Sequence, residues 1–174
     1  MKHFIKYFSI TLFLIFSSDL LAQEKIALLD LKYVLNESKA GKGAQDFLKK
    51  SYNKNIKKFK DIETSLKKEE ADLLSKKTVI SKEEYTKKSD TLRKKVIDYQ
   101  SQRRAAMDKI TTQRAESRAT LIKSITPILE TYIKENNISV VIRKIHTLGG
   151  SPETDITNII VEKLNKVLPS LDLK

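Results

Sequence analysis

The sequence predicts an α+β protein, mostly α-helical, in which a small β-rich association body carries a long antiparallel helical hairpin. Three observations support this prediction. Residues 44–126 contain neither glycine nor proline, and apolar residues recur through them at helical spacing. Short apolar runs typical of buried strands flank this stretch at residues 25–30 and 138–142. Residues 42–126 are therefore expected to form two arms, and residues 23–41 and 127–174 to form the body.

The first arm carries a seam of residues at alternating steps of four and three. Such spacing places the seam on one side of a helix, as in a coiled coil. Two polar residues, Asn55 and Glu69, interrupt it. The seam positions are Leu48, Tyr52, Asn55, Phe59, Ile62, Leu66, Glu69 and Leu73.

The second arm repeats this spacing with a weaker seam, because small and polar residues occupy many of its positions. We therefore expect a loosely held antiparallel hairpin of helices rather than a tight zipper. The seam positions are Tyr85, Ser89, Leu92, Val96, Tyr99, Arg103, Ala106, Ile110, Gln113 and Ser117.

The turn between the arms is predicted near residues 78–80. Lys76 and Lys77 suit a helix C-terminus, where the helix dipole favours positive charge. Ser81 and Glu84 form an S-x-x-E capping box, which starts a new helix. An arm spanning residues 40–77 would reach roughly 55–60 Å at ~1.5 Å per residue.

The N-terminal part of the body is predicted to be a strand at residues 25–30, with Asp30 as the N-cap of a short helix. Gly41 and Gly43 are expected to form a joint into the first arm. Their spacing lacks the G-x-x-x-x-G-K-[ST] pattern of a phosphate-binding loop. At the other end of the arms, Pro127 is expected to kink or restart the helix, because proline cannot donate a backbone hydrogen bond.

The C-terminal part of the body is predicted to hold a second strand and a last helix. Asn136 and Asn137 suit a left-handed helix end. Residues 138–142 are rich in β-branched side chains, which favour a strand. Residues 148–152 are typical of a turn, and Thr157 is a candidate N-cap for the final helix.

The two predicted strands would have open edges in a monomer. The body contains roughly 65 residues, a size at which a single core is marginal. We therefore expect the bodies to associate edge to edge into a closed oligomer. The residues predicted to mediate this association are Ile26, Leu28, Val140, Val141 and Ile142.

Residues 1–22 are typical of a secretory signal peptide, with cleavage near Ala22. Lys2 and Lys6 precede an apolar run at residues 7–16. A short membrane anchor is the alternative, although the run is well below the ~20 residues that a membrane span requires. The sequence has no cysteine, so the fold gains no disulfide.

The chain has a net charge of +12, and residues 44–126 hold 22 basic and 12 acidic residues. The arms therefore carry +10 of the net charge. Two interpretations stay open: solvated helical faces, or a surface that attracts an anionic partner at long range.

No catalytic constellation is evident. His3 lies in the predicted signal peptide, and His146 stands alone near a predicted turn. The acidic residues of the arms lie among lysines, as expected for ion-paired helical faces. We predict a protein that is not an enzyme and needs no metal or other cofactor.

Both ends of the mature chain resemble the Skp/OmpH family of periplasmic chaperones for outer-membrane proteins. The matching segments are KIALLDL at 25–31, VLNESKAGK at 34–42, ENNISVVI at 135–142, DIT at 155–157 and KLN at 163–165. This resemblance implies a homotrimer whose helical tentacles enclose a cavity. It also implies an ATP-independent holdase that binds unfolded outer-membrane β-barrel proteins, its clients, and helps their delivery to the outer membrane.

Loosely packed arms with scattered apolar groups and long basic side chains suit such a role, because many weak contacts sum to strong binding. Some family members are proposed to bind lipopolysaccharide through a basic cluster, which this sequence does not match residue by residue. Anionic lipid or lipopolysaccharide is thus a further partner to consider, without assigned residues. The predicted client-binding residues are Tyr85, Leu92, Val96, Tyr99, Arg103, Arg104, Ile110 and Arg114.

Two other functions fit parts of the sequence. A sequence pI near 9.7 suits a nucleic-acid-binding protein, but a signal peptide and the lack of a base-reading motif argue against that partner. A structural coiled coil of the cell envelope fits the long helices. The interruptions at Asn55, Glu69 and Arg103 argue against a stiff rod.

Overall fold

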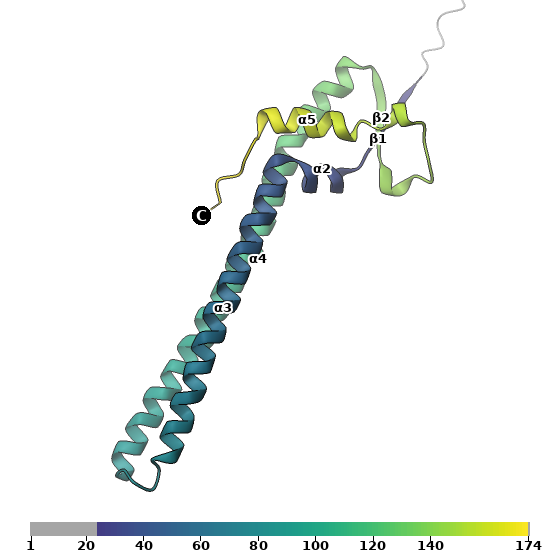
Figure 1. The fold of residues 1–174 in the computed structure, drawn as a ribbon. Helices are drawn as coiled ribbons and strands as arrows, with labels where there is room; N and C mark the ends of the chain where they lie inside the picture. Colours follow the sequence, from purple (N-terminus) through teal and green to yellow (C-terminus); the bar gives the residue numbers. More distant parts are fainter. Residues whose placement is uncertain (1–23, 174) are drawn as a thin grey trace, which may run out of the picture.

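The computed structural model describes residues 24–173, so the predicted signal peptide lies outside the described residues. A long two-helix hairpin projects from a small body, as Figure 1 shows. The predicted fold class, mostly helical with a small sheet, is confirmed. The elements in order are β1 (Lys25–Leu29), α2 (Leu31–Glu37), α3 (Lys39–Ser75), α4 (Lys82–Glu135), β2 (Ile138–Arg143), the 3-10 turns η1 (Lys144–His146) and η2 (Pro152–Thr154), and α5 (Thr157–Val167).

The turn between α3 and α4 comprises residues 76–81. The Val79 and Ile80 amides both donate to the Lys76 carbonyl, at 3.0 and 3.1 Å, which closes the turn that follows α3. The side chain of Ser81 accepts a hydrogen bond from the Glu84 amide, at 3.1 Å. The predicted Ser81 cap is confirmed, and it satisfies an amide that the new helix leaves unpaired.

The structure does not interrupt the second arm at Pro127. Helix α4 continues through Pro127 to Glu135, so the predicted restart at this residue is wrong. Proline costs the helix one backbone hydrogen bond. Ile125, Ile128 and Leu129 around it pack on the core of the body, and this burial offsets the cost.

The two glycines near the start of α3 do not form a joint. Ser38 caps the helix through its hydroxyl, which accepts from the Gly41 amide, and both glycines lie in the first turns. A Cβ at Gly41 would clash with the Leu35 carbonyl and would lie 2.9 Å from the Ser38 hydroxyl oxygen. Gly41 therefore permits the close approach of α2 and α3, and the predicted flexible joint is replaced by a tight corner.

Strands β1 and β2 form a two-stranded parallel sheet, with Ile26 opposite Val140 and Leu28 opposite Ile142. Ala27 and Leu29 point to the other face of the sheet and join the core. The edge of β1 that faces away from β2 is partly covered, because the Ile156 amide donates to the Leu28 carbonyl at 3.0 Å. Within residues 24–173, no strand pairs with the outer edge of β2.

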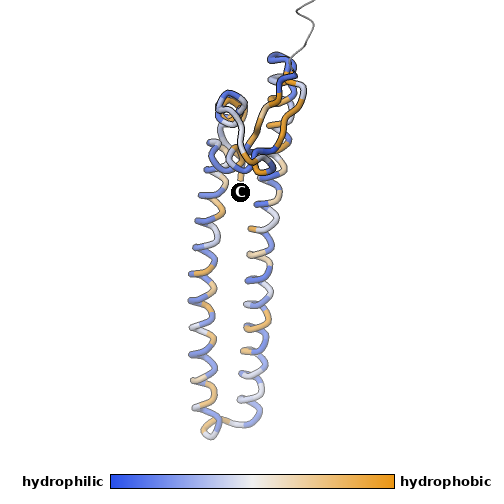
Figure 2. Tube along the Cα trace, turned by 90° about the vertical axis from the view of Figure 1, so that its right-hand side faces the viewer, coloured by the Kyte–Doolittle hydropathy of each residue, from blue (hydrophilic) through white to orange (hydrophobic). Residues whose placement is uncertain are grey.

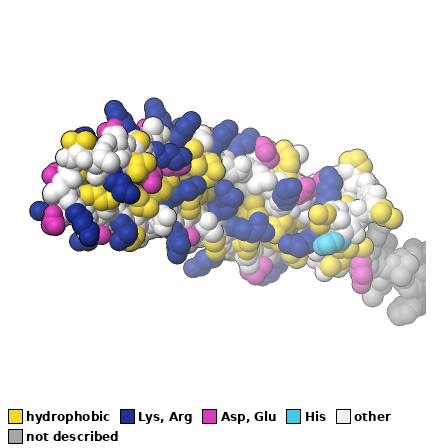
Figure 3. All heavy atoms as spheres, turned by 90° about the horizontal axis from the view of Figure 1, so that it is seen from below, with side chains coloured by type: hydrophobic (Ala, Val, Ile, Leu, Met, Phe, Trp, Pro, Cys, Tyr) yellow, Lys and Arg dark blue, Asp and Glu magenta, His cyan; other side chains and the backbone are white. Residues whose placement is uncertain are grey.

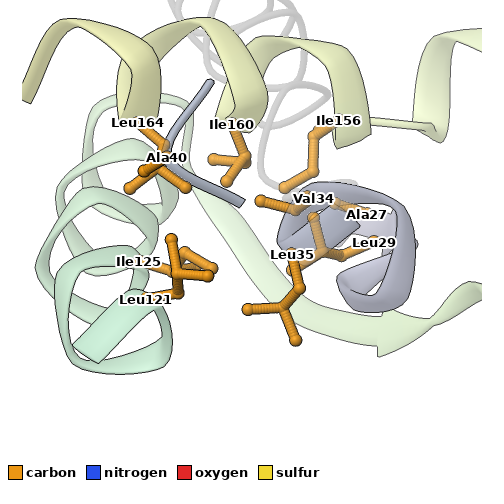
Figure 4. Packing of buried hydrophobic residues seen from close by; sticks show 10 residues of the cluster. All are labelled: Ala27, Leu29, Val34, Leu35, Ala40, Leu121, Ile125, Ile156, Ile160 and Leu164. Carbon is orange, nitrogen blue, oxygen red and sulfur yellow. The ribbon is translucent and has the colours of Figure 1, made fainter. Parts of the chain in front are cut away.

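Every α-helix of the body contributes to one buried apolar cluster, and both arms are rooted in it. Figure 4 shows its side chains converging between α2, α5 and the body end of α4. Ala40 comes from the first arm, and Leu121 and Ile125 come from the second arm. The other members are Ala27, Leu29, Val34, Leu35, Ile156, Ile160 and Leu164.

Local backbone and side-chain contacts define the end of α4 and the start of α5. Asn137 adopts a positive φ of 51°, which confirms the predicted left-handed end of α4. Thr157 is not the N-cap of α5 but its first residue. Its amide donates to the Asp155 carboxylate at 3.0 Å, while its hydroxyl accepts from the Asp30 amide at 2.9 Å. The hydroxyl therefore ties α5 to the end of β1 instead of capping its own helix.

Gly41→Ala should lower the free energy of unfolding by about 1–3 kcal/mol, because the added methyl overpacks the corner between α2 and α3. Urea unfolding followed by circular dichroism would measure the change. Gly43→Ala is the matched control, since no atom lies within 4 Å of an added Cβ there. It should stabilise the protein by up to about 1 kcal/mol. Equal effects at both glycines would contradict the tight corner.

Candidate functional site

The outer part of the hairpin holds a shallow groove between the arms, with a volume of about 520 Å³. Between residues 60 and 109, neither arm contains a fully buried residue. Figure 2 shows the two helices running side by side from the body to the turn, with hydrophobic positions spaced along both. The apolar residues that line the groove are Leu66, Leu73, Leu74, Tyr85, Leu92, Val96 and Tyr99.

Polar contacts join the arms along the outer hairpin. Glu69 pairs with Lys95 across the arms at 2.6 Å. The Tyr99 hydroxyl donates to the Glu63 carboxylate at 3.5 Å, and the Tyr99 ring meets the Phe59 ring edge-on, with centroids 6.0 Å apart. A hydrogen bond from Lys67 is the main cause of the lowered pKa of Glu63. These contacts hold the arms in register without filling the space between them.

Four of the predicted client-binding residues lie together in this groove. Tyr85, Leu92, Val96 and Tyr99 are all half-buried and line it from α4. They contribute to the hairpin seam and keep part of their surface open. The same side chains therefore help to join the arms and keep apolar surface accessible in the groove.

The other four predicted residues lie nearer the body, outside the groove. Arg103, Arg104 and Arg114 are exposed, whereas Ile110 is only 6% exposed. In this conformation Ile110 supports the packing of the arms and offers no surface to a partner.

The site prediction missed the contribution of α3 to the groove. Leu66 and Leu73 occupy seam positions of the first arm, so the seam itself was the signal that could have identified them. Leu74, beside the seam, is 62% exposed and also lines the groove. No periodic signal distinguishes it from the charged residues around it.

The predicted association residues separate into two groups. Ile26 and Val140 are paired across the sheet and are each nearly half exposed. Leu28 is covered by the loop after η1, since a Cβ at Gly150 would lie 2.8 Å from its side chain. Val141 packs on the core, and Ile142 is half-buried. The accessible apolar part of the sheet is therefore the Ile26–Val140 pair.

Comparison with known proteins identifies the relatives of this chain. The model of the OmpH-like outer membrane protein family matches residues 25–164. The chain belongs to the OmpH-like family. The Skp-like protein of Pseudomonas aeruginosa is 25% identical over 171 residues, which cover 96% of this chain and 99% of the relative.

The OmpH-like fold is also found in a solved structure. An OmpH-like protein of Caulobacter crescentus CB15, described as an outer membrane chaperone, matches with a TM-score of 0.80 at 18% identity. The match covers 88% of this chain and 90% of the other. At this identity, the similarity establishes the shared fold.

Two kinds of feature are absent from the described part of this OmpH-like protein. Residues 24–173 hold no group of three or more His, Cys, Asp or Glu side chains arranged to bind a metal ion. None of the helices within the same range combines the length and the apolar character needed to cross a membrane.

Glu69→Leu should tighten the packing of the outer arms, because it replaces a charged seam residue with an apolar one that α4 can cover. Amide hydrogens at residues 66–100 should exchange more slowly in hydrogen exchange measured by mass spectrometry. Asp61→Leu is the control, since it adds the same side chain at an exposed position outside the seam. Unchanged exchange in Glu69→Leu would show that the polar interruption does not keep the arms loose.

Proposed function

We propose that this protein is an ATP-independent holdase chaperone of the periplasm. It binds unfolded outer-membrane β-barrel proteins between its arms, prevents their aggregation and helps their delivery to the outer membrane. One observation carries the proposal: the outer hairpin has no buried residue between positions 60 and 109, so apolar side chains remain accessible along the arms. A hairpin built only as a rigid spacer would gain stability by burying them.

The chemistry of the groove suits an unfolded polypeptide. An unfolded barrel protein exposes alternating apolar residues and unpaired backbone groups. Half-exposed leucines, valine and tyrosines can contact such side chains weakly at many points, and the sum of these contacts raises avidity without an energy source. Long Lys and Arg side chains around the groove can cover apolar surface while their charges stay in water.

The relatives support a chaperone role. The Pseudomonas aeruginosa relative is named for its likeness to Skp, and the Caulobacter crescentus protein is described as an outer membrane chaperone. The proposed location follows from this family and from the signal-like residues 1–22.

Self-association, as a homotrimer, is the second part of the proposal. The exposed Ile26–Val140 pair and the open outer edge of β2 are supporting observations, since an unpaired edge beside apolar surface favours strand or face association. Several arms on one assembled body would surround a client and multiply the weak contacts.

An aggregation assay tests the holdase function. A urea-unfolded outer-membrane β-barrel protein is diluted into buffer containing residues 23–174 without nucleotide, and light scattering is followed. We expect suppression near three chains per client. Combined Leu73→Ser and Leu92→Ser should weaken suppression several-fold, because these residues line the groove.

The control for the groove variant is combined Ile97→Ser and Ile122→Ser. Both isoleucines are exposed apolar residues of α4 that do not line the groove. An equal loss of suppression in the control variant would show that client holding does not depend on the groove. A lack of suppression by the unmodified protein in excess would reject the holdase function.

Val140→Asp should convert the oligomer to monomers, because it places charge on the proposed association surface. Light scattering coupled to size-exclusion chromatography would report the mass. Val79→Asp at the arm turn makes the same change at an exposed position far from the sheet, and it should leave the mass unaltered. A monomeric mass for the unmodified protein at micromolar concentration would refute the trimer.

A further inference from the structure

The segment that follows α5 lies beside the base of the arms. Helix α5 ends where the Leu168 amide donates to the Leu164 carbonyl at 2.7 Å, and Pro169 has no amide hydrogen to extend it. Residues 169–173 form neither helix nor strand. Figure 1 and Figure 2 both show the chain after α5 reaching the level at which the arms leave the body. Residues 168–173, which we call the strap, lie beyond the segment 25–164 that the family model matches.

Leucine side chains attach the strap to the body. Leu168 and Leu171 are partly buried and pack on the apolar cluster in which both arms are rooted, and Leu173 is half-buried. Ser170 and Asp172, which alternate with Leu171 and Leu173, are exposed. Residues 170–173 therefore turn apolar side chains toward the protein and polar side chains toward solvent, with the two-residue period of an extended chain.

This alternation is also the pattern of the proposed client. A transmembrane β-strand alternates apolar and polar residues, so an unfolded barrel protein consists largely of such segments. The strap has the same pattern without forming a strand itself, and it already occupies an apolar surface of the protein. A client segment therefore has the chemistry needed to occupy the same surface.

The contact that holds the strap is small. Its three leucines are only partly buried, so each contributes only part of the stabilisation that a fully buried leucine provides. The loss of backbone freedom in an ordered extended segment opposes that contribution. An apolar segment of another chain can therefore compete with the strap for its place on the cluster.

We propose that the surface beneath the strap is a second client-binding site, which the strap occupies until an alternating apolar segment of an unfolded polypeptide displaces it. This inference rests on the proposed function and adds a site at the base of the arms to the groove in their outer part. Without a client, the strap covers apolar side chains of the body that would otherwise be exposed to other proteins.

One client can reach both sites. Ala40 in the core cluster and Leu66 in the groove lie about 39 Å apart along α3, at ~1.5 Å per residue. An extended chain covers this distance with about twelve residues. Figure 3 shows that hydrophobic side chains on the visible face lie in separate patches between Lys and Arg side chains. Apolar contacts are thus distributed along the molecule, and binding at two separate sites raises avidity.

The first test measures binding of a labelled peptide by fluorescence anisotropy. The peptide has about ten residues, the length of one barrel strand, and alternates leucine with serine or aspartate. Combined Leu171→Ser and Leu173→Ser should release the strap and strengthen peptide binding about three- to tenfold, because a tethered competitor is lost. Removal of residues 169–174 should have the same effect.

The matched control is combined Ile159→Ser and Val167→Ser. These residues of α5 are 39% and 67% exposed, so the control makes the same kind of change beside the strap but outside it. Peptide binding should change by less than about twofold, as expected for exposed positions. Circular dichroism would verify that every variant is folded.

A second measurement leaves the leucines of the strap intact. The chain contains no cysteine, so Ser170→Cys provides a single thiol for a nitroxide spin label at an exposed position. Electron paramagnetic resonance should show a restricted label without peptide and a mobile label at saturating peptide, because the displaced strap moves freely.

The outcomes separate this inference from the holdase function. Unchanged or weakened peptide binding in both strap variants, equal strengthening in the α5 control, or a label that stays restricted at saturating peptide would each overturn the second site. Absence of peptide binding by every variant would overturn it too. Displacement of the strap without suppression of aggregation would support the second site and reject the holdase. Suppression of aggregation with the strap in place would support the holdase and reject the second site.

Discussion

The packing of both arms into one small core is the constraint on which the rest of the structure depends. Ala40 at the start of α3 and Leu121 and Ile125 in α4 are buried beside side chains of α2 and α5. The hairpin therefore leaves the body with a fixed direction, although its outer half buries nothing completely. Because tertiary packing holds both arms at their base, their outer parts can keep apolar and charged surface accessible.

Much of the fold was predictable because its signals are local. The Ser81 cap, the left-handed Asn137 and the two strands depend on a few adjacent residues, and the structure bears them out. The errors at Gly41 and Pro127 have a common cause. Considered without their tertiary contacts, glycine and proline both predict an interruption of a helix. Here Gly41 permits close packing of α3 against Leu35, and the apolar neighbours of Pro127 pack on the core and keep α4 continuous.

The position of the candidate site along the arms was predictable, but the burial of its individual residues was not. Helical spacing identified the seam of α4, and Tyr85 and Leu92 do line a groove. The same spacing cannot tell how closely two helices approach, so it did not separate buried Ile110 from half-exposed Val96. Glu69 illustrates the reason. As a polar seam residue it forms an ion pair with Lys95 of the other arm, and such a pair joins two helices without burying side chains between them.

The parallel pairing of β1 with β2 places a condition on how the chain folds. These strands are joined in space but separated by the entire hairpin, so β1 is made first and has no partner until more than a hundred further residues have followed. Antiparallel helices can form meanwhile from nearby contacts, which are quick to find. The two strands then meet because the hairpin returns the second arm to the body. Closure of the sheet is thus expected late, leaving an apolar strand unpaired in the nascent chain.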